Sequence, residues 1–107
     1  MRSAAVILAL AAGVLPVAAV PATAQDAPAP EAVQAGSKIF AQTCAPCHGA
    51  RMRDPEGAFD LRTFPRGQHD RFVRSVTNGK NAMPPWGGVL SPEEIEVLWA
   101  YVQTGGG

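Results

Sequence analysis

Residues 43–50 have the sequence TCAPCHGA and include both cysteines of the 107-residue chain and one of its two histidines. Two thiols two residues apart, followed directly by an imidazole, are compatible with three kinds of site. These are a structural zinc site, a thiol–disulfide redox pair, and the attachment point of a covalent haem. The rest of the sequence distinguishes between them.

A structural zinc site is the first alternative, and the chain is poor in ligands for it. Such sites take four Cys or His ligands, typically with a second pair at a spaced interval. Besides His48 the chain has only His69, far along the sequence. His48 also follows Cys47 directly, which makes tetrahedral binding of one ion by both side chains awkward. Zinc binding is therefore disfavoured.

A thiol–disulfide oxidoreductase is the second alternative. Its Cys-x-x-Cys opens a helix that follows a strand, where the helix dipole lowers the thiol pKa. Here the apolar spacing predicts a short helix over about residues 33–42, so that the motif comes at a helix end. No stretch alternates like a strand. This alternative is disfavoured as well.

Covalent haem is the third alternative and the one that the sequence favours. Thioethers from Cys44 and Cys47 can reach vinyl groups on adjacent pyrroles, which leaves His48 placed to bind the iron through Nε2. An apolar porphyrin would also supply the core that so short a chain otherwise lacks. We therefore predict one covalently bound haem c, with His48 as an axial iron ligand.

The N-terminus predicts export, which haem attachment outside the cytoplasm requires. Arg2 precedes an uncharged run rich in Ala, Val and Leu that ends in PATA, where Ala22 and Ala24 satisfy the small-x-small rule. Residues 1–24 are predicted to be a cleaved signal peptide, and Pro16 disfavours a retained membrane anchor. The mature protein is expected in the periplasm, without stable membrane insertion.

The remaining sequence predicts an all-α domain. Residues 25–32 form a flexible Ala/Pro leader, 33–104 the domain and 105–107 a Gly tail. A second helix is expected over about 69–77 and a last one up to about residue 103. The last begins with Ser91 as N-cap, Pro92 at the first position and Glu94 completing a capping box.

Three stretches resemble class I c-type cytochromes: GSKIFAQTCAPCHG at 36–49, NGKNAMPPWGGVLS at 78–91 and EEIEVLWAYV at 93–102. The resemblance covers about residues 33–104. It implies the cytochrome c fold, in which three to four short helices and long loops wrap around one covalently attached haem. It also implies one-electron transfer as the function.

The resemblance gives a reason for a glycine inside the first predicted helix, where glycine is costly. In this family the first and last helices cross closely, with a glycine and an aromatic residue against an aliphatic and an aromatic one. Gly36 and Phe40 match the first pair, and Leu98 and Tyr101 match the second. Gly36 is therefore expected to allow close backbone approach.

Met83 is the predicted sixth ligand of the iron. It lies in a proline-bounded loop long enough to pass round the porphyrin edge, and Pro84 keeps it extended. The resemblance points to the same residue, whereas the structural alternative is a methionine that fills a packing gap. Two rivals are weaker, because Met52 is too close to His48 in sequence and His69 precedes a helix and is expected to be exposed.

The sequence departs from the family beside the proximal ligand. A proline carbonyl usually accepts the Nδ1 proton of that histidine, but Phe59 stands at the expected place. Pro55 or another backbone carbonyl would then orient His48. The candidate donors to the haem propionates are Trp86, Arg62 and Arg66, with packing or solvation as the simpler role of each.

Iron with both axial positions filled has no open site for a substrate, so the chain is predicted to be an electron carrier and not an enzyme. The expected partners are a redox donor and a redox acceptor, for example a periplasmic dehydrogenase such as a quinoprotein alcohol dehydrogenase, and an oxidase or larger cytochrome. They would dock near Cys44 and Cys47, and the pair Arg51 and Arg53 favours an acidic partner. The chain carries no formal net charge, which excludes a polybasic nucleic-acid binder, and a monomer is expected. The alternative is a haem enzyme or gas sensor with an open or labile distal site.

Overall fold

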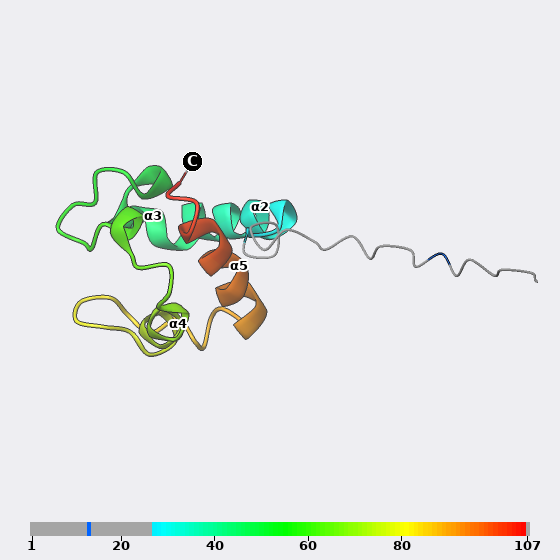
Figure 1. The fold of residues 1–107 in the computed structure, drawn as a ribbon. Helices are drawn as coiled ribbons and strands as arrows, with labels where there is room; N and C mark the ends of the chain where they lie inside the picture. The colour runs from blue at the N-terminus through cyan, green and yellow to red at the C-terminus, as the bar shows by residue number, and fades with distance from the viewer. Residues whose placement is uncertain (1–12, 14–26, 107) are drawn as a thin grey trace, which may run out of the picture.

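The computed structural model describes Gly13 and residues 27–106, and this part of the chain is helical (Figure 1). Apart from Gly13, the predicted signal peptide lies outside the described residues. The elements are α2 (Pro30–Ile39), a π-helical turn (Phe40–Cys44), α3 (Ala45–His48), 3₁₀ turns (Ala50–Met52 and Leu61–Thr63), α4 (His69–Asn78) and α5 (Pro92–Val102). Between residues 27 and 106 the only pairing of extended backbone is an isolated bridge from Lys80 to Met83. The all-α prediction is confirmed.

The first helix begins at Pro30, whereas the sequence predicted a start at Val33. Residues 30–32 are therefore helical and do not belong to a flexible leader. The missing N–H of proline costs nothing in the first turn, where it would have no partner within the helix. Glu31 in the same turn also interacts favourably with the helix dipole.

The crossing of α2 and α5 forms the frame of the domain. Gly36 is buried at this crossing, and a Cβ there would collide with the Val97 carbonyl oxygen and come within 2.9 Å of the Tyr101 Cβ. The Phe40 and Tyr101 rings pack with centroids 5.3 Å apart, and Leu98 is only 1% exposed. The close approach expected from Gly36 is present.

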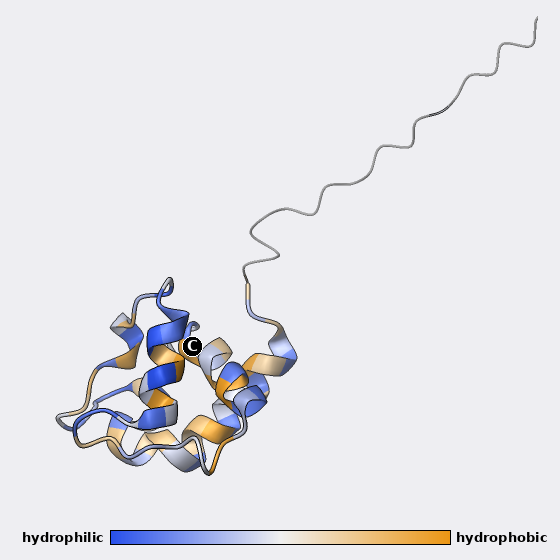
Figure 2. Ribbon diagram, turned by 90° about the horizontal axis from the view of Figure 1, so that it is seen from below, coloured by the Kyte–Doolittle hydropathy of each residue, from blue (hydrophilic) through white to orange (hydrophobic). Residues whose placement is uncertain are grey.

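An aromatic cluster joins α4 to α5. The Phe72 ring from α4 lies 5.0 Å from Trp99 of α5, and Phe64 packs edge-on against both at 5.8 Å. Figure 2 shows hydrophobic and hydrophilic segments alternating along the helices, as expected where each has one buried face. The core therefore lies between the three long helices.

The start of α5 matches its predicted capping box. The Ser91 hydroxyl accepts a hydrogen bond from the Glu94 N–H at 3.1 Å, and the Glu94 carboxylate accepts one from the Ser91 N–H at 3.0 Å. Among residues 27–106, no helix has the length and apolar character needed to cross a bilayer.

Candidate haem-binding site

A cavity of about 500 Å³ opens between α3, α4 and the loop that follows α4. Its lining includes Cys44, Cys47, His48 and Met83, the four residues that the sequence singles out. The volume lies within the range of pockets for cofactors, about 300–1,000 Å³. Much of the remaining wall is apolar, formed by Phe59, Leu61, Phe64, Phe72 and Trp86. Size and lining both fit a porphyrin.

The proximal segment, residues 36–49, is helical from Gly36 to His48 and contains a π-helical turn. The π-turn Phe40–Cys44 continues α2 into α3, which ends at His48. The run stops at Gly49, whose φ of 83° favours glycine, and a Cβ there would collide with the Arg53 carbonyl oxygen. The chain therefore reverses directly after the imidazole.

The His48 ring is held by a backbone carbonyl. Its Nδ1 lies 3.0 Å from the carbonyl oxygen of Phe59. A carbonyl only accepts hydrogen bonds, so Nδ1 carries the proton and the Nε2 lone pair is left for a metal. Phe59 thus does through its backbone what the family's proline does, and Pro55 does not.

Met83 is positioned by a tight turn. The Lys80 N–H donates to the Met83 carbonyl at 3.1 Å, and the Met83 N–H donates back to the Lys80 carbonyl at 3.0 Å. Asn81 within the turn has a φ of 54°, and Gly79 before it has a φ of 77°. A Cβ at Gly79 would lie 2.7 Å from the Met83 carbonyl oxygen, so glycine is required for the loop to pass.

The end of the same loop is tied to α4. The Trp86 N–H donates to the Val76 carbonyl at 2.8 Å, and the Gly87 N–H donates to the Thr77 carbonyl at 3.1 Å. The last carbonyls of a helix lack hydrogen-bond partners within it, and the N–H groups of this loop serve as those partners. The distal segment, residues 79–87, is thus fixed at both ends by backbone hydrogen bonds.

The environment of the thiols opposes thiol–disulfide chemistry. Burial, with a smaller contribution from the nearby Cys47, raises the pKa of the Cys44 thiol to about 11. A redox-active pair needs a lowered pKa, usually at a helix N-terminus. Cys44 and Cys47 instead lie along the C-terminal part of a helical run. Residues 27–106 also contain no group of three or more His, Cys, Asp or Glu side chains placed to hold a metal ion.

Neither rival ligand lies at the cavity. Met52 is fully buried in the core and lines no part of it. His69 lies at the start of α4 with its side chain 41% exposed; its Nε2 is 2.8 Å from the Glu96 carboxylate and its Nδ1 is 3.3 Å from Asp70. Both side chains have other roles.

Of the three candidate propionate donors, only one lines the cavity. Trp86 lines the cavity, whereas Arg62 forms a two-point ion pair with Asp60 at 2.9 Å and Arg66 is exposed away from the lining. Sequence reasoning missed Arg71, which does line the cavity. The feature of the sequence that could have identified Arg71 is its position directly before Phe72, which is buried on α4.

Comparison with known proteins identifies a matching family and several relatives. Residues 31–102 match the family described as cytochrome c oxidase, cbb3-type, subunit III. A cytochrome c6 of Limnospira maxima is 42% identical over 79 residues, which cover 65% of this chain and 89% of the relative. A cytochrome c6 of a Nostoc species is 40% identical over 72 residues, covering 63% of this chain and 65% of the relative.

The cbb3-type cytochrome c oxidase subunit FixP of Azorhizobium caulinodans is 38% identical over 82 residues. These residues cover 71% of this chain but only 28% of the relative. The family match covers more than half of the chain, and it spans the cavity and every helix from α2 to α5. The chain therefore belongs to the cytochrome c family as a small class I c-type cytochrome, a one-electron carrier with one covalent haem c.

Proposed function

We propose that Cys44 and Cys47 hold the haem as thioethers and that His48 and Met83 bind its iron. The observation that carries this assignment is that these side chains, from two separate segments, line one cavity. The hydrogen bond from His48 to Phe59 supports it further, because Nε2 is then free to bind.

The chain's own residues account for electron carriage. Bound haem supplies an iron that gains or loses one electron. His48 is held in one tautomer by the Phe59 carbonyl, so its ring need not reorient when the charge changes. Met83 contributes a neutral thioether, and a Met/His pair raises the potential relative to two histidines. Phe64, Phe72 and Trp86 give the cavity that both residues line a largely apolar wall.

The location and partners form part of the proposal. Residues 1–24 act as a cleaved signal peptide, and the mature carrier works in the periplasm as a monomer. Its donor is a dehydrogenase and its acceptor an oxidase or a larger cytochrome. The relative FixP is named as an oxidase subunit, which supports an oxidase as the class of the acceptor. Such encounters use small interfaces, below about 1,200 Å².

The test uses the exported protein purified with its haem. We expect low-spin spectra in both redox states, a far-red sulfur-to-iron charge-transfer band in the oxidised state and a reversible one-electron titration. Carbon monoxide should bind poorly. High-spin iron with rapid carbon monoxide binding would contradict the ligand set and favour a gas sensor or haem enzyme. A colourless protein with two freely titrating thiols would contradict the haem site itself.

A further inference from the structure

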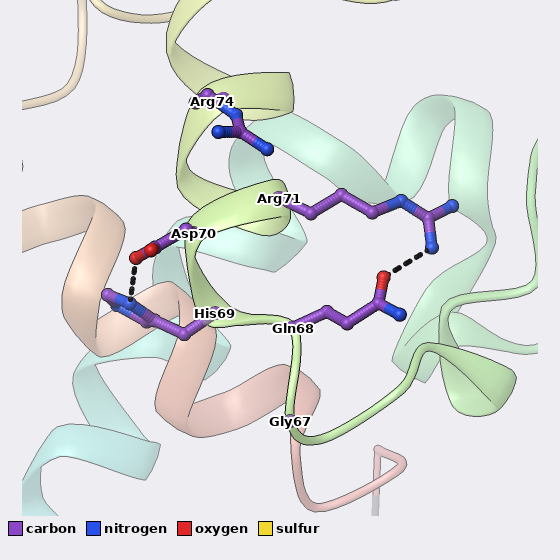
Figure 3. A pocket seen from close by; sticks show the side chains of 6 residues that line it. All are labelled: Gly67, Gln68, His69, Asp70, Arg71 and Arg74. Carbon is purple, nitrogen blue, oxygen red and sulfur yellow. Dashed lines mark hydrogen bonds and ion pairs between the residues drawn. The ribbon is translucent and has the colours of Figure 1, made fainter.

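Arg71 is a cationic side chain in the wall of the haem cavity, and it is held there by its neighbours. Its guanidinium carbon lies 5.0 Å from the centroid of the Phe64 ring. One of its terminal nitrogens donates to the Gln68 side-chain oxygen at 2.8 Å (Figure 3). The Phe64 ring is itself packed edge-on against Phe72 and Trp99. The arginine therefore rests on a rigid aromatic platform.

The charge of Arg71 has no carboxylate partner among residues 27–106, where the ion pairs involve Arg62 and His69 instead. Its contacts are a neutral amide and an aromatic face. A guanidinium gains most from an anion with two oxygens, because the planar fork binds carboxylates through paired hydrogen bonds. The cavity that it lines is the place where such an anion would come from a bound group.

Haem carries two propionate carboxylates, and anions at the wall of a largely apolar cavity need a compensating partner. We infer that Arg71 is a positioning residue that pairs with a haem propionate and thereby raises the potential of the iron. A cation near the iron disfavours the ferric state, which carries one more positive charge than the ferrous state. The inference rests on haem filling the cavity described above.

Arg74 provides a matched control. It lies one turn further along α4, is exposed, and lines the polar recess at the start of the helix (Figure 3). It is not among the residues that line the haem cavity. Arg71 lines both. The variants Arg71→Gln and Arg74→Gln remove the same charge from neighbouring turns of one helix.

The experiment measures the midpoint potential of the holoprotein variants between pH 5 and 8. Arg71→Gln should lower the potential by an amount equivalent to up to about a tenfold change in the redox equilibrium, or ~59 mV for one electron. Its potential should also fall more steeply with rising pH than that of the wild type, because the propionate left without Arg71 ionises within this range and stabilises ferric iron. The other titratable side chains on the cavity wall are unchanged in every variant; they are Cys44, Cys47, His48, Glu56 and Lys80.

Arg74→Gln should keep the wild-type potential and the wild-type pH dependence, and Arg71→Lys should recover part of the loss. Equal potentials and slopes in Arg71→Gln and Arg74→Gln would overturn the inference. If Arg71→Gln does not fold, the comparison of Arg71→Lys with Arg74→Lys decides, since lysine loses the fork and only the first should shift. Propionates are present whatever the sixth ligand is, so a spectrum without sulfur ligation would refute the Met83 assignment and leave this comparison valid.

Discussion

His48 ends a helical run that is packed against α5, whereas Met83 lies in a loop whose shape depends on backbone hydrogen bonds. The proximal segment (36–49) is fixed by the Gly36 crossing, and its imidazole is fixed again by the Phe59 carbonyl. In the distal segment (79–87) the backbone of Met83 is held. Its side chain is a thioether that accepts hydrogen bonds only weakly.

This difference predicts two kinds of failure. Changes on the proximal side should remove the cofactor or destabilise the fold, because that side belongs to the helical frame. Changes on the distal side should weaken ligation and alter the potential while the protein stays folded. Segments with few buried contacts open at lower free energy than the core, which is the physical basis of the distinction.

The largest effect is expected from the proximal thiols. The double variant Cys44→Ala, Cys47→Ala should lose all covalent haem, since no other cysteine exists in the chain. Mass spectrometry of the exported protein after acidic acetone extraction measures this directly. Met83→Leu is the distal counterpart and should keep its covalent haem. Haem that stays attached in the double variant would contradict the thioether assignment.

Gly36→Ala should destabilise the domain by about 3 kcal/mol, at the upper end of overpacking costs. Alanine would otherwise stabilise a helix interior by about 1 kcal/mol, so the sign of the change tests the crossing with Val97. Urea unfolding gives the free energy. Gly67→Ala, where a Cβ meets nothing within 4 Å, should change stability by less than about 0.5 kcal/mol. Similar values for both variants would contradict the proposed frame.

Gly79→Ala should affect ligation more than folding. The new Cβ approaches the Met83 carbonyl and the residue must keep a positive φ, so the loop shifts at a cost of about 1–2 kcal/mol. The far-red band should weaken and carbon monoxide should bind faster. Gly88→Ala, just beyond the distal segment and with open space around its Cβ, should behave as wild type. A fully retained band in Gly79→Ala would show that the loop does not control the sulfur.

The smallest effect is expected where α4 meets α5. Hydrogen bonding to Glu96, with a lesser contribution from Asp70, raises the pKa of His69 above its usual 6.5. The stabilisation is therefore complete below about pH 6.5 and is lost as pH rises through the raised pKa. His69→Gln should lower stability by under about 1 kcal/mol at pH 5, because the pair is exposed, and by nothing at pH 9. A difference that grows with pH in urea unfolding would contradict the assignment.

The sequence was sufficient to predict those features that depend on the type and spacing of side chains. The motif around Cys44, the capping box at Ser91 and the glycine at position 36 each require particular residue types, and the structure has them where the patterns predict. Phe59 occupies the expected place of the family's proline, but the choice between its carbonyl and that of Pro55 stayed open, because a backbone acceptor leaves no mark on residue type. Arg71 was missed for a related reason, since an arginine beside an apolar helix face is usually solvated.

The start of α2 and the π-turn belong to a second class of difference. Pro30 is compatible with both a leader and a first helical turn, so only tertiary packing decides between them. The π-turn at Phe40–Cys44 adds width to the helical run, a backbone change that periodicity of apolar residues does not reveal. Both features concern the backbone of the helical run that leads to the cavity, and neither changes which residues line the cavity.

Met83 is the residue on which electron carriage depends most directly, and a matched pair of methionines tests its role. Met83 lines the cavity and Met52 is fully buried in the core, so Met83→Leu and Met52→Leu make the same chemical change at two sites. The measurement is the far-red charge-transfer band and midpoint potential of the two oxidised holoproteins. Met83→Leu should abolish the band and shift the potential by roughly a tenth of a volt or more, within the ~0.8 V that axial ligands span. Met52→Leu should keep both, and a band that survives in Met83→Leu would contradict the central claim.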